Sequence, residues 1–173
     1  MPSPNLTTAA PVDLRPFMAE FPTGVSVVTS FETDGGPWGM TCSSLCSVAL
    51  EPPTLIVCLR EGSPTLRAVL AHGSFALNLL HEQSRETAEL FASGARDRFD
   101  RVVWTAPDDG RGGPRLTESA HLTADCAVAR VEYVGDHAVV FGEVLRVTRL
   151  SSTAPLLYGM RNYASWPVGA KER

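Results

Sequence analysis

Small polar side chains without charge gather in one stretch of this sequence. No charged residue occurs in the sixteen positions from Gly35 to Leu50, and Met40–Ser47 places four hydroxyl and two thiol groups in eight positions. Hydroxyl and backbone N–H groups reach ring heteroatoms without burying a charge, so they suit a flat, mostly apolar ligand with polar edges. A flavin ring is a ligand of this kind. The stretch also fits a half-buried strand whose polar face carries Ser and Thr, and taken alone it leaves both interpretations open.

The elements that hold this stretch are expected to be mostly strands. Val25–Phe31 is rich in β-branched residues, turn residues follow at Asp34–Pro37, and Trp38–Ser44 is typical of the antiparallel partner in a hairpin. The other expected strands are Thr54–Leu59, Phe75–Leu80, Leu122–Val134 and His137–Leu150, and the expected helices are Leu14–Phe21 after Asp13, Ser63-Pro64 to about His72, and Ser84 to Gly94. Strands therefore outnumber helices.

The connections between these elements favour one fold class. Most neighbouring strands are joined by hairpins, the clearest at Gly135-Asp136, and the alternation of strands and helices typical of a doubly wound sheet is missing. The fold class we expect is mainly β, a closed antiparallel barrel with a few peripheral helices. Three prolines with Ser, Thr and Ala predict a flexible tail over 1–12, followed by a single domain over 13–173.

Composition and charge exclude several function classes. The chain has 173 residues, of which 44% are hydrophobic, and a formal net charge of -4 without a basic run, so neither nucleic acid nor a membrane surface is an expected partner. The apolar stretches are shorter than a membrane span, and the N-terminus lacks the order of a signal peptide, so we expect a cytoplasmic protein. The four cysteines form no C-x-x-C pair and the four histidines are dispersed, so a metal site is not expected.

Two common enzyme classes lack their signatures. No G-x-G-x-x-G follows a strand, and Gly110–Pro114 has neither the spacing nor the context of a phosphate-binding loop. No G-x-S-x-G elbow singles out a serine nucleophile. A Rossmann domain and a serine hydrolase are therefore not expected.

Six motifs occur together in an order that resembles one family. They are Pro22–Thr29 with Gly39–Ser44, Ser47–Pro53, Phe75–Leu80, Arg98-Phe99, Gly135–His137 with Gly142–Val144, and Pro155–Tyr158 with Tyr163. In this order they resemble the short-chain flavin reductases, the reductase halves of two-component flavin-dependent monooxygenases. The resemblance extends from about Leu14 to Trp166. It departs from the family where Cys42-Ser43-Ser44 replaces the frequent Ala-Asn-Ser, so one amide donor is lost.

The resemblance implies a Greek-key split β-barrel, a homodimer, and an NAD(P)H:flavin oxidoreductase. It would transfer a hydride from NADH or NADPH to FMN or FAD and supply reduced flavin to a partner monooxygenase. The cofactor-binding residues implied are Thr23, Gly24, Val25, Thr41, Cys42, Ser43, Ser44, Cys46, Ser47, Val48, Asn78, His137, Tyr158 and Tyr163. No catalytic acid, base or nucleophile is required, because positioning two rings is the protein's task.

Several residue assignments keep a structural alternative. Asn78 could hold a phosphate or satisfy a backbone group inside its strand, and His137 could address the nicotinamide nucleotide or be a solvated turn residue. Tyr158 and Tyr163 could line a pocket, or seal a core or a dimer seam. For the whole protein, the alternatives are a flavin protein that retains its flavin as a prosthetic group for a dedicated substrate, and a partner-binding barrel without flavin.

Overall fold

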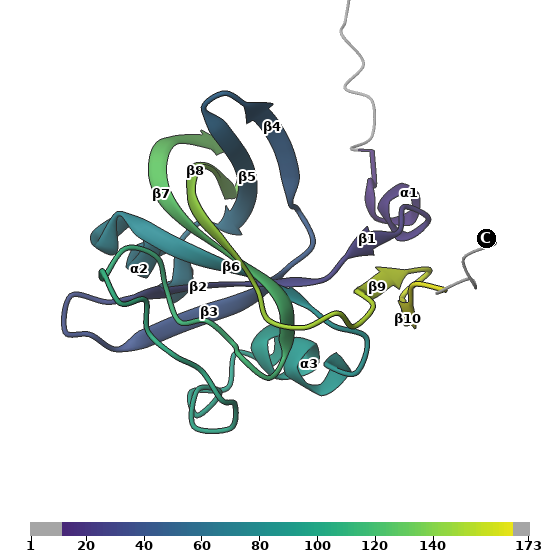
Figure 1. Cartoon of the computed structure of the whole chain (residues 1–173). Helices are drawn as coiled ribbons and strands as arrows, with labels where there is room; N and C mark the ends of the chain where they lie inside the picture. The colour runs from purple at the N-terminus through teal and green to yellow at the C-terminus, as the bar shows by residue number, and fades with distance from the viewer. Residues whose placement is uncertain (1–11, 168–173) are drawn as a thin grey trace, which may run out of the picture.

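The computed structural model describes residues 12–167 (Figure 1), so the expected tail, apart from Val12, lies outside the described residues. The helices of this part are α1 (Arg15–Ala19), α2 (Pro64–His72) and α3 (Arg85–Ser93). The strands are β1 (Thr23–Gly24), β2 (Ser26–Phe31), β3 (Pro37–Cys42), β4 (Cys46–Leu50), β5 (Pro53–Arg60), β6 (Ser74–Leu80), β7 (Ala120–Val134), β8 (His137–Arg149), β9 (Leu156–Gly159) and β10 (Asn162–Ser165). None of these helices is long and apolar enough to cross a membrane.

The strands form two antiparallel sheets. A seven-stranded sheet has the order β3-β2-β6-β7-β8-β5-β4, and a three-stranded sheet has the order β1-β9-β10. Every ladder in both sheets is antiparallel. The expectation of a mainly β fold with few helices is therefore confirmed.

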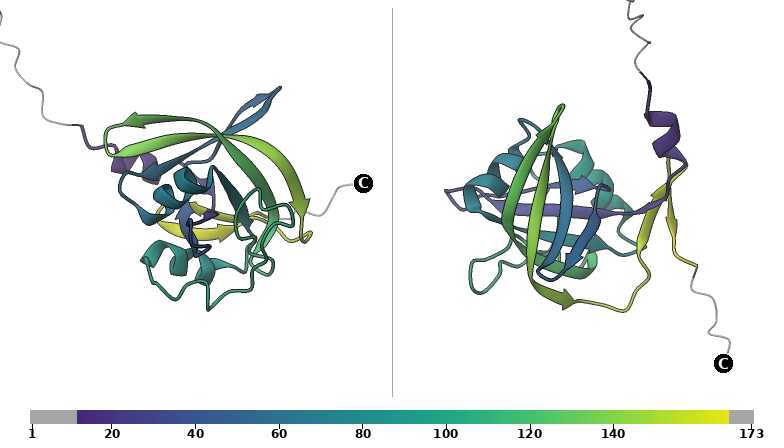
Figure 2. Two further views of the ribbon diagram at one scale, coloured as in Figure 1. Left: turned by 90° about the vertical axis from the view of Figure 1, so that its left-hand side faces the viewer. Right: turned by 90° about the horizontal axis from the view of Figure 1, so that it is seen from above.

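The large sheet is strongly curved (Figure 2), and its two edge strands are neighbours in the sequence. β3 and β4 lie at opposite ends of the hydrogen-bonded order, yet only Ser43–Leu45 connects them. The sheet must therefore curl until its edges come close. The expected closure is not shown, because within residues 12–167 no strand ladder joins β3 to β4.

The expected hairpins are present with small shifts in their ends. β2 pairs with β3 from Ser26–Cys42 to Phe31–Pro37, and β7 pairs with β8 up to Val134–His137, next to Gly135 at φ 59°. A residue with positive φ in a two-residue turn favours glycine, which explains why this turn was visible in the sequence. The strands β1, β4, β9 and β10 were not expected.

The helix ends differ more from expectation. α1 covers Arg15–Ala19 rather than Leu14–Phe21 and buries none of its side chains, so no apolar face anchors a longer helix. α2 begins as expected, because the Ser63 hydroxyl accepts the Leu66 N–H at 3.2 Å and proline occupies its first position. Ser84 does not cap α3, since its hydroxyl lies 3.2 Å from Nδ1 of His81 instead.

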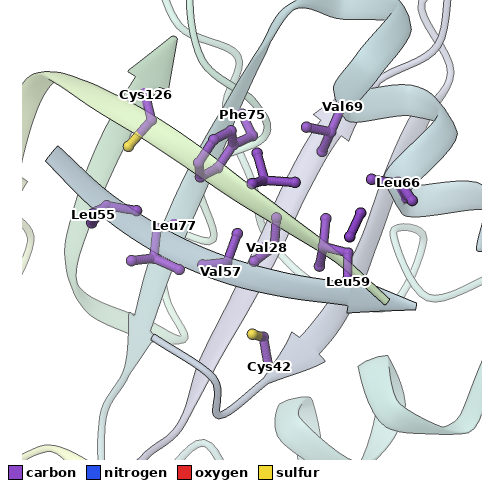
Figure 3. Packing of buried hydrophobic residues seen from close by; sticks show 12 residues of the cluster. Val28, Cys42, Leu55, Val57, Leu59, Leu66, Val69, Phe75, Leu77 and Cys126 are labelled. Carbon is purple, nitrogen blue, oxygen red and sulfur yellow. The ribbon is translucent and has the colours of Figure 1, made fainter. Parts of the chain in front are cut away.

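The main core lies inside the curve of the large sheet (Figure 3). Val28 from β2, Val57 from β5 and Phe75 from β6 meet there, and α2 adds Leu66 and Val69 from one end. Each fully buried side chain of this size contributes roughly 1.5–3 kcal/mol to folding. α2 is thereby fixed to the sheet, and with it the residues at its N-terminus.

A second cluster lies on the other face of β2. Val25 and Val27 pack there with Ala88 and Phe91 of α3, while Val28 faces the main core. Neighbouring residues of a strand point to opposite faces, so a strand buried on both faces is apolar or small throughout. This packing places α3 beside β3 and the connection that follows it.

Gly142 on β8 shows how tightly the main core is filled. A Cβ atom at this position would lie 2.5 Å from Cζ of Phe75, far inside van der Waals contact. The absence of a side chain at Gly142 therefore makes room for the Phe75 ring.

Candidate functional site

The connection between β3 and β4 lies at the surface, where the two edges of the large sheet approach each other. β3 ends at Cys42, opposite the first residue of β2, and β4 begins at Cys46. Ser43, Ser44 and Leu45, which lie between them, are exposed. The neutral polar stretch is thus divided into a paired strand, an exposed connection and an edge strand.

Two hydroxyl groups of this stretch are occupied by the protein itself. Thr41 Oγ1 donates to Ala88 O on α3 at 2.6 Å. Ser44 Oγ accepts from Cys58 N at 2.9 Å and donates to Cys58 O at 3.1 Å. Within residues 12–167 the side chains of Ser43 and Ser47 have no such hydrogen bond, so their hydroxyls are the ones left for a ligand.

The Cys42 side chain turns away from the surface. It is 6% exposed and belongs to the main core, at whose margin it lies in Figure 3. Burial raises the pKa of its thiol, which lies 3.0 Å from Ser44 Oγ. The group therefore remains a protonated thiol at neutral pH, and only the backbone of Cys42 could serve a ligand.

Three adjoining hollows surround Ser43 and the end of β3. The tyrosine hollow, of about 360 Å³, is lined among others by Ser43, Arg85, Ala92, Tyr158, Arg161 and Tyr163. The arginine hollow, of about 440 Å³, is lined among others by Trp38, Thr41, Ser63, Ala92, Arg96 and Arg98. The α1 hollow, of about 660 Å³, is lined among others by Met18, Phe21, Thr23, Ser43, Cys46 and Arg161. The tyrosine hollow shares Ser43 with the α1 hollow and Ala92 with the arginine hollow, so the three lie next to one another.

The tyrosine hollow combines aromatic rings with a cation. The rings of Tyr158 and Tyr163 lie 5.1 Å apart between centroids, and Arg85 Cζ lies 5.4 Å from the Tyr163 centroid. Glu89 binds Arg85, with 2.8 Å between Oε1 and Nε. Burial and the nearby Glu89 carboxylate raise the pKa of Tyr163, so its phenol keeps the proton that it can donate. Such a wall suits flat rings, and Arg161 at the same hollow adds a positive charge.

The small three-stranded sheet places β1 beside these tyrosines. Thr23 pairs with Tyr158 and Gly24 with Leu157, and the Val25 N–H donates to Leu156 O at 3.0 Å. Thr23 lines the α1 hollow and Val25 lines the tyrosine hollow. Gly24 lies between them in the strand.

The arginine hollow was missed as a site in the sequence analysis. Arg98 is 6% exposed, its Cζ lies 5.2 Å from the Trp38 ring centroid, and burial lowers its pKa. Within residues 12–167 neither Arg96 nor Arg98 has an acidic partner. The N-terminus of α2 lies at the same hollow through Ser63. Two cations beside a helix N-terminus suit a phosphate group. The pair Arg98-Phe99, noted for the resemblance, was the available signal.

His137 lies apart from these hollows, at the turn between β7 and β8. It is exposed, and its Nδ1 lies 2.8 Å from Asp136 Oδ1. The turn approaches the end of β5, where the Glu61 N–H donates to Asp136 O at 2.9 Å. His137 is not among the residues that line the tyrosine, arginine or α1 hollow.

Asn78 is not brought to the hollows. It is completely buried in β6, and its Nδ2 donates to Val27 O at 3.2 Å, Thr29 Oγ1 at 3.1 Å and Pro114 O at 3.2 Å. Its Oδ1 accepts the Leu116 N–H at 2.8 Å. The geometry matches the structural alternative for Asn78, because the amide is surrounded by protein partners.

The residues expected on β4 lie along the edge of the large sheet. Cys46 and Val48 are exposed, and Cys46 lines the α1 hollow. Ser47 lies instead at an apolar groove of about 370 Å³ with Leu45, Leu50 and Leu55. Among the described residues β4 pairs only with β5, so within 12–167 the backbone groups on its other side have no strand partner.

Comparison with known proteins identifies the family of the chain. The model of the flavin reductase like domain matches residues 18–167. The chain belongs to this family. It is 48% identical over 165 residues to an NADPH flavin reductase from Lentzea aerocolonigenes, with 95% of this chain and 94% of the relative covered. It is 34% identical over 154 residues to the reductase subunit of a flavin-dependent monooxygenase from Rhodococcus jostii, with 88% and 76% covered.

The fold is similar to that of a solved oxidoreductase structure. The NADH:FAD oxidoreductase of Streptomyces globisporus, in complex with NAD and FAD fragments, matches with a TM-score of 0.83 at 31% identity. The match covers 94% of this chain and 100% of that one. The family expected from the sequence is therefore confirmed, and with it the enzyme class, an oxidoreductase that uses NADH or NADPH to reduce FMN or FAD.

Proposed function

We propose that this chain binds FMN or FAD in the hollows around Ser43, reduces it there with a hydride from NADH or NADPH, and supplies the reduced flavin to a separate monooxygenase. The observation that carries the proposal is the meeting of a free neutral hydroxyl, two tyrosine rings and guanidinium groups at the end of β3. The Rhodococcus relative, a reductase subunit, supports the monooxygenase partner.

The flavin supplies the redox chemistry, and the chain supplies positions for its parts. The Ser43 hydroxyl and the unpaired backbone edge of β4 from Cys46 to Val48 are neutral donors for the polar edge of the ring. Arg96, Arg98 and the N-terminus of α2 are suited to the flavin phosphate. Thr41 and Ser44 shape this region through their bonds to Ala88 and Cys58.

The nicotinamide nucleotide is assigned to the aromatic side of the site. Tyr158 and Tyr163 form a wall beside Ser43, and Arg161 lies at the same hollow for an anionic group, whereas Arg85 is paired with Glu89. Hydride transfer needs the two rings in contact, so the nicotinamide must lie within reach of the flavin at Ser43. His137 lies apart from the tyrosine hollow, so this placement does not include it, and its role toward the nicotinamide nucleotide is a separate proposal that kinetics can test.

A homodimer is part of the proposal. α1 buries none of its side chains within the chain, and Phe17 and Phe21 are 71% and 59% exposed. On β4, Leu50 is 85% exposed. Exposed apolar side chains of this size, at α1 with the α1 hollow and at the apolar groove that Leu50 lines, support coverage by a second copy. Light scattering should give twice the monomer mass at micromolar concentration, and a monomer mass would contradict the dimer.

Three further points from the sequence analysis remain proposals. The curvature of the sheet and the three-residue connection between β3 and β4 support the Greek-key split barrel. A single domain over 13–173 and a cytoplasmic location are the other two. None of them changes the chemistry assigned to the site.

The test is the oxidation of NADH and of NADPH with FMN, FAD and riboflavin each added in turn. The proposal expects turnover that depends on added flavin, and it fails if none of the six combinations gives flavin-dependent turnover. A yellow protein that oxidises the nucleotide without added flavin would instead favour the alternative of a retained prosthetic group.

A further inference from the structure

Within residues 12–167, the backbone groups on one side of Cys58 in β5 pair with no strand. The ladder between β4 and β5 starts at Cys46 and Ile56, so β4 does not reach Cys58. On its other side, Cys58 lies opposite Val139 of β8. β3 has no ladder with β5 within residues 12–167. At this position the two edges of the sheet therefore approach each other without strand pairing.

The side chain of Ser44 bonds to these backbone groups. Its Oγ accepts the Cys58 N–H at 2.9 Å, donates to Cys58 O at 3.1 Å and lies 3.0 Å from Sγ of Cys42. A hydroxyl has one hydrogen to donate and two lone pairs that accept. The two Cys58 groups and the Cys42 thiol together use this full capacity, which leaves nothing for a flavin.

We propose that Ser44 is a positioning residue for the flavin, because its hydroxyl ties the β3–β4 connection to β5 and so holds Ser43 at the tyrosine and α1 hollows. We call this set of bonds the Ser44 latch. The connection has only three residues, so fixing its middle residue restricts both neighbours. The inference rests on the proposed flavin site at Ser43.

The test is a double-mutant cycle on flavin affinity, measured by fluorescence quenching without nicotinamide. Ser43→Ala and Ser44→Ala should each raise the flavin Kd by about two- to twelvefold, the range for one hydrogen bond. If Ser44 acts through Ser43, the two substitutions should not be additive. The fold increase in flavin Kd caused by Ser43→Ala should then be less than half as large in the Ser44→Ala background as in the wild type. Equal fold-changes in the two backgrounds would overturn the proposal.

Two further variants separate positioning from general damage. Ser44→Thr keeps the hydroxyl at an exposed position and should bind flavin within about twofold of the wild type, since the latch persists. Ser151→Ala removes a hydroxyl 2.7 Å from Thr153 in the connection between β8 and β9 and should leave the Kd unchanged. A Ser44→Thr protein as weak as Ser44→Ala contradicts the latch. Should Ser44→Ala fail to fold, Ser44→Gly, which also removes the hydroxyl, takes its place in the cycle.

Amide hydrogen exchange at Cys58 tests the latch without any flavin. The Cys58 amide should exchange faster in Ser44→Ala than in the wild type, and at the wild-type rate in Ser151→Ala. Unchanged exchange in Ser44→Ala contradicts the latch, whereas a wild-type protein that binds no flavin contradicts the proposed function. The two failures are therefore distinguishable.

Discussion

Asn78→Ala should destabilise the fold and leave flavin binding nearly intact. Asn78 is completely buried, and its Oδ1 is the acceptor for the N–H of Leu116, which is itself 0% exposed. An alanine leaves this donor buried and unpaired, at a cost of about 1–3 kcal/mol. The small cavity left by the amide adds to this cost. We expect a loss of roughly 2–4 kcal/mol in the free energy of unfolding.

The backbone carbonyl groups that accept from Asn78 Nδ2 lose less than the Leu116 N–H does, so they add little to the loss in free energy of unfolding. Pro114 O keeps the hydrogen bond from Thr29 Oγ1 at 2.6 Å after the Asn78 amide is removed. For a chain of this length, 1 kcal/mol corresponds to about 2–4 °C in Tm. Denaturant unfolding and thermal unfolding should both show the loss.

The control is the other asparagine among the described residues, Asn162. It is exposed and donates to Met160 O at 3.0 Å, so Asn162→Ala should change the free energy of unfolding by less than about 0.5 kcal/mol. Flavin affinity of folded Asn78→Ala should stay within about twofold of the wild type. If Asn78→Ala is as stable as the wild type but binds flavin tenfold more weakly, Asn78 is a ligand residue and its structural role is refuted.

Three other predictions address the site and the thiols. Ser43→Ala should raise the flavin KM by about two- to twelvefold. His137→Ala should instead raise the NAD(P)H KM or lower kcat, and leave the flavin Kd within about twofold of the wild type. Steady-state kinetics measures the KM and kcat values, and fluorescence quenching measures the flavin Kd. Iodoacetamide at pH 8, followed by mass spectrometry, should label the exposed Cys46 before the buried Cys126, whose pKa burial raises to about 12. The unfolded chain releases the Cys126 proton near pH 9, whereas the folded chain holds it until about pH 12. The stability that comes from the protonated Cys126 thiol is therefore complete below pH 9 and declines as the pH rises toward 12. Denaturant unfolding at several pH values can measure this decline.

Local signals predicted the local parts of the fold. The hairpin at Gly135-Asp136 followed from turn chemistry, and α2 followed from Ser63-Pro64, because these structures depend on residues close together in the sequence. β1, β9 and β10 were missed, since Thr23 pairs with Tyr158 far along the chain and each strand is too short to show a period. No local pattern encodes such pairing.

The site was predicted in part for the same reason. The neutral stretch identified Ser43, and the structure brings it together with Tyr158 and Tyr163. The sequence could not show that the Ser44 hydroxyl is bonded to Cys58, fourteen residues away. Nor could it show that the Asn78 amide is bonded to Val27 and Thr29 of the adjacent strand β2 and to Pro114. A polar residue type predicts the capacity to bind, but only the fold decides whether a ligand or the protein uses that capacity.

The most direct test of the central claim, that flavin is a substrate which this chain reduces and releases, is anaerobic flavin bleaching. A trace of enzyme is mixed with a large molar excess of flavin and NADH or NADPH, and the visible flavin absorption is followed. The account predicts that all of the flavin is reduced, at a rate proportional to the enzyme concentration. Bleaching that stops after about one flavin per chain, or no bleaching with either nucleotide, would contradict it.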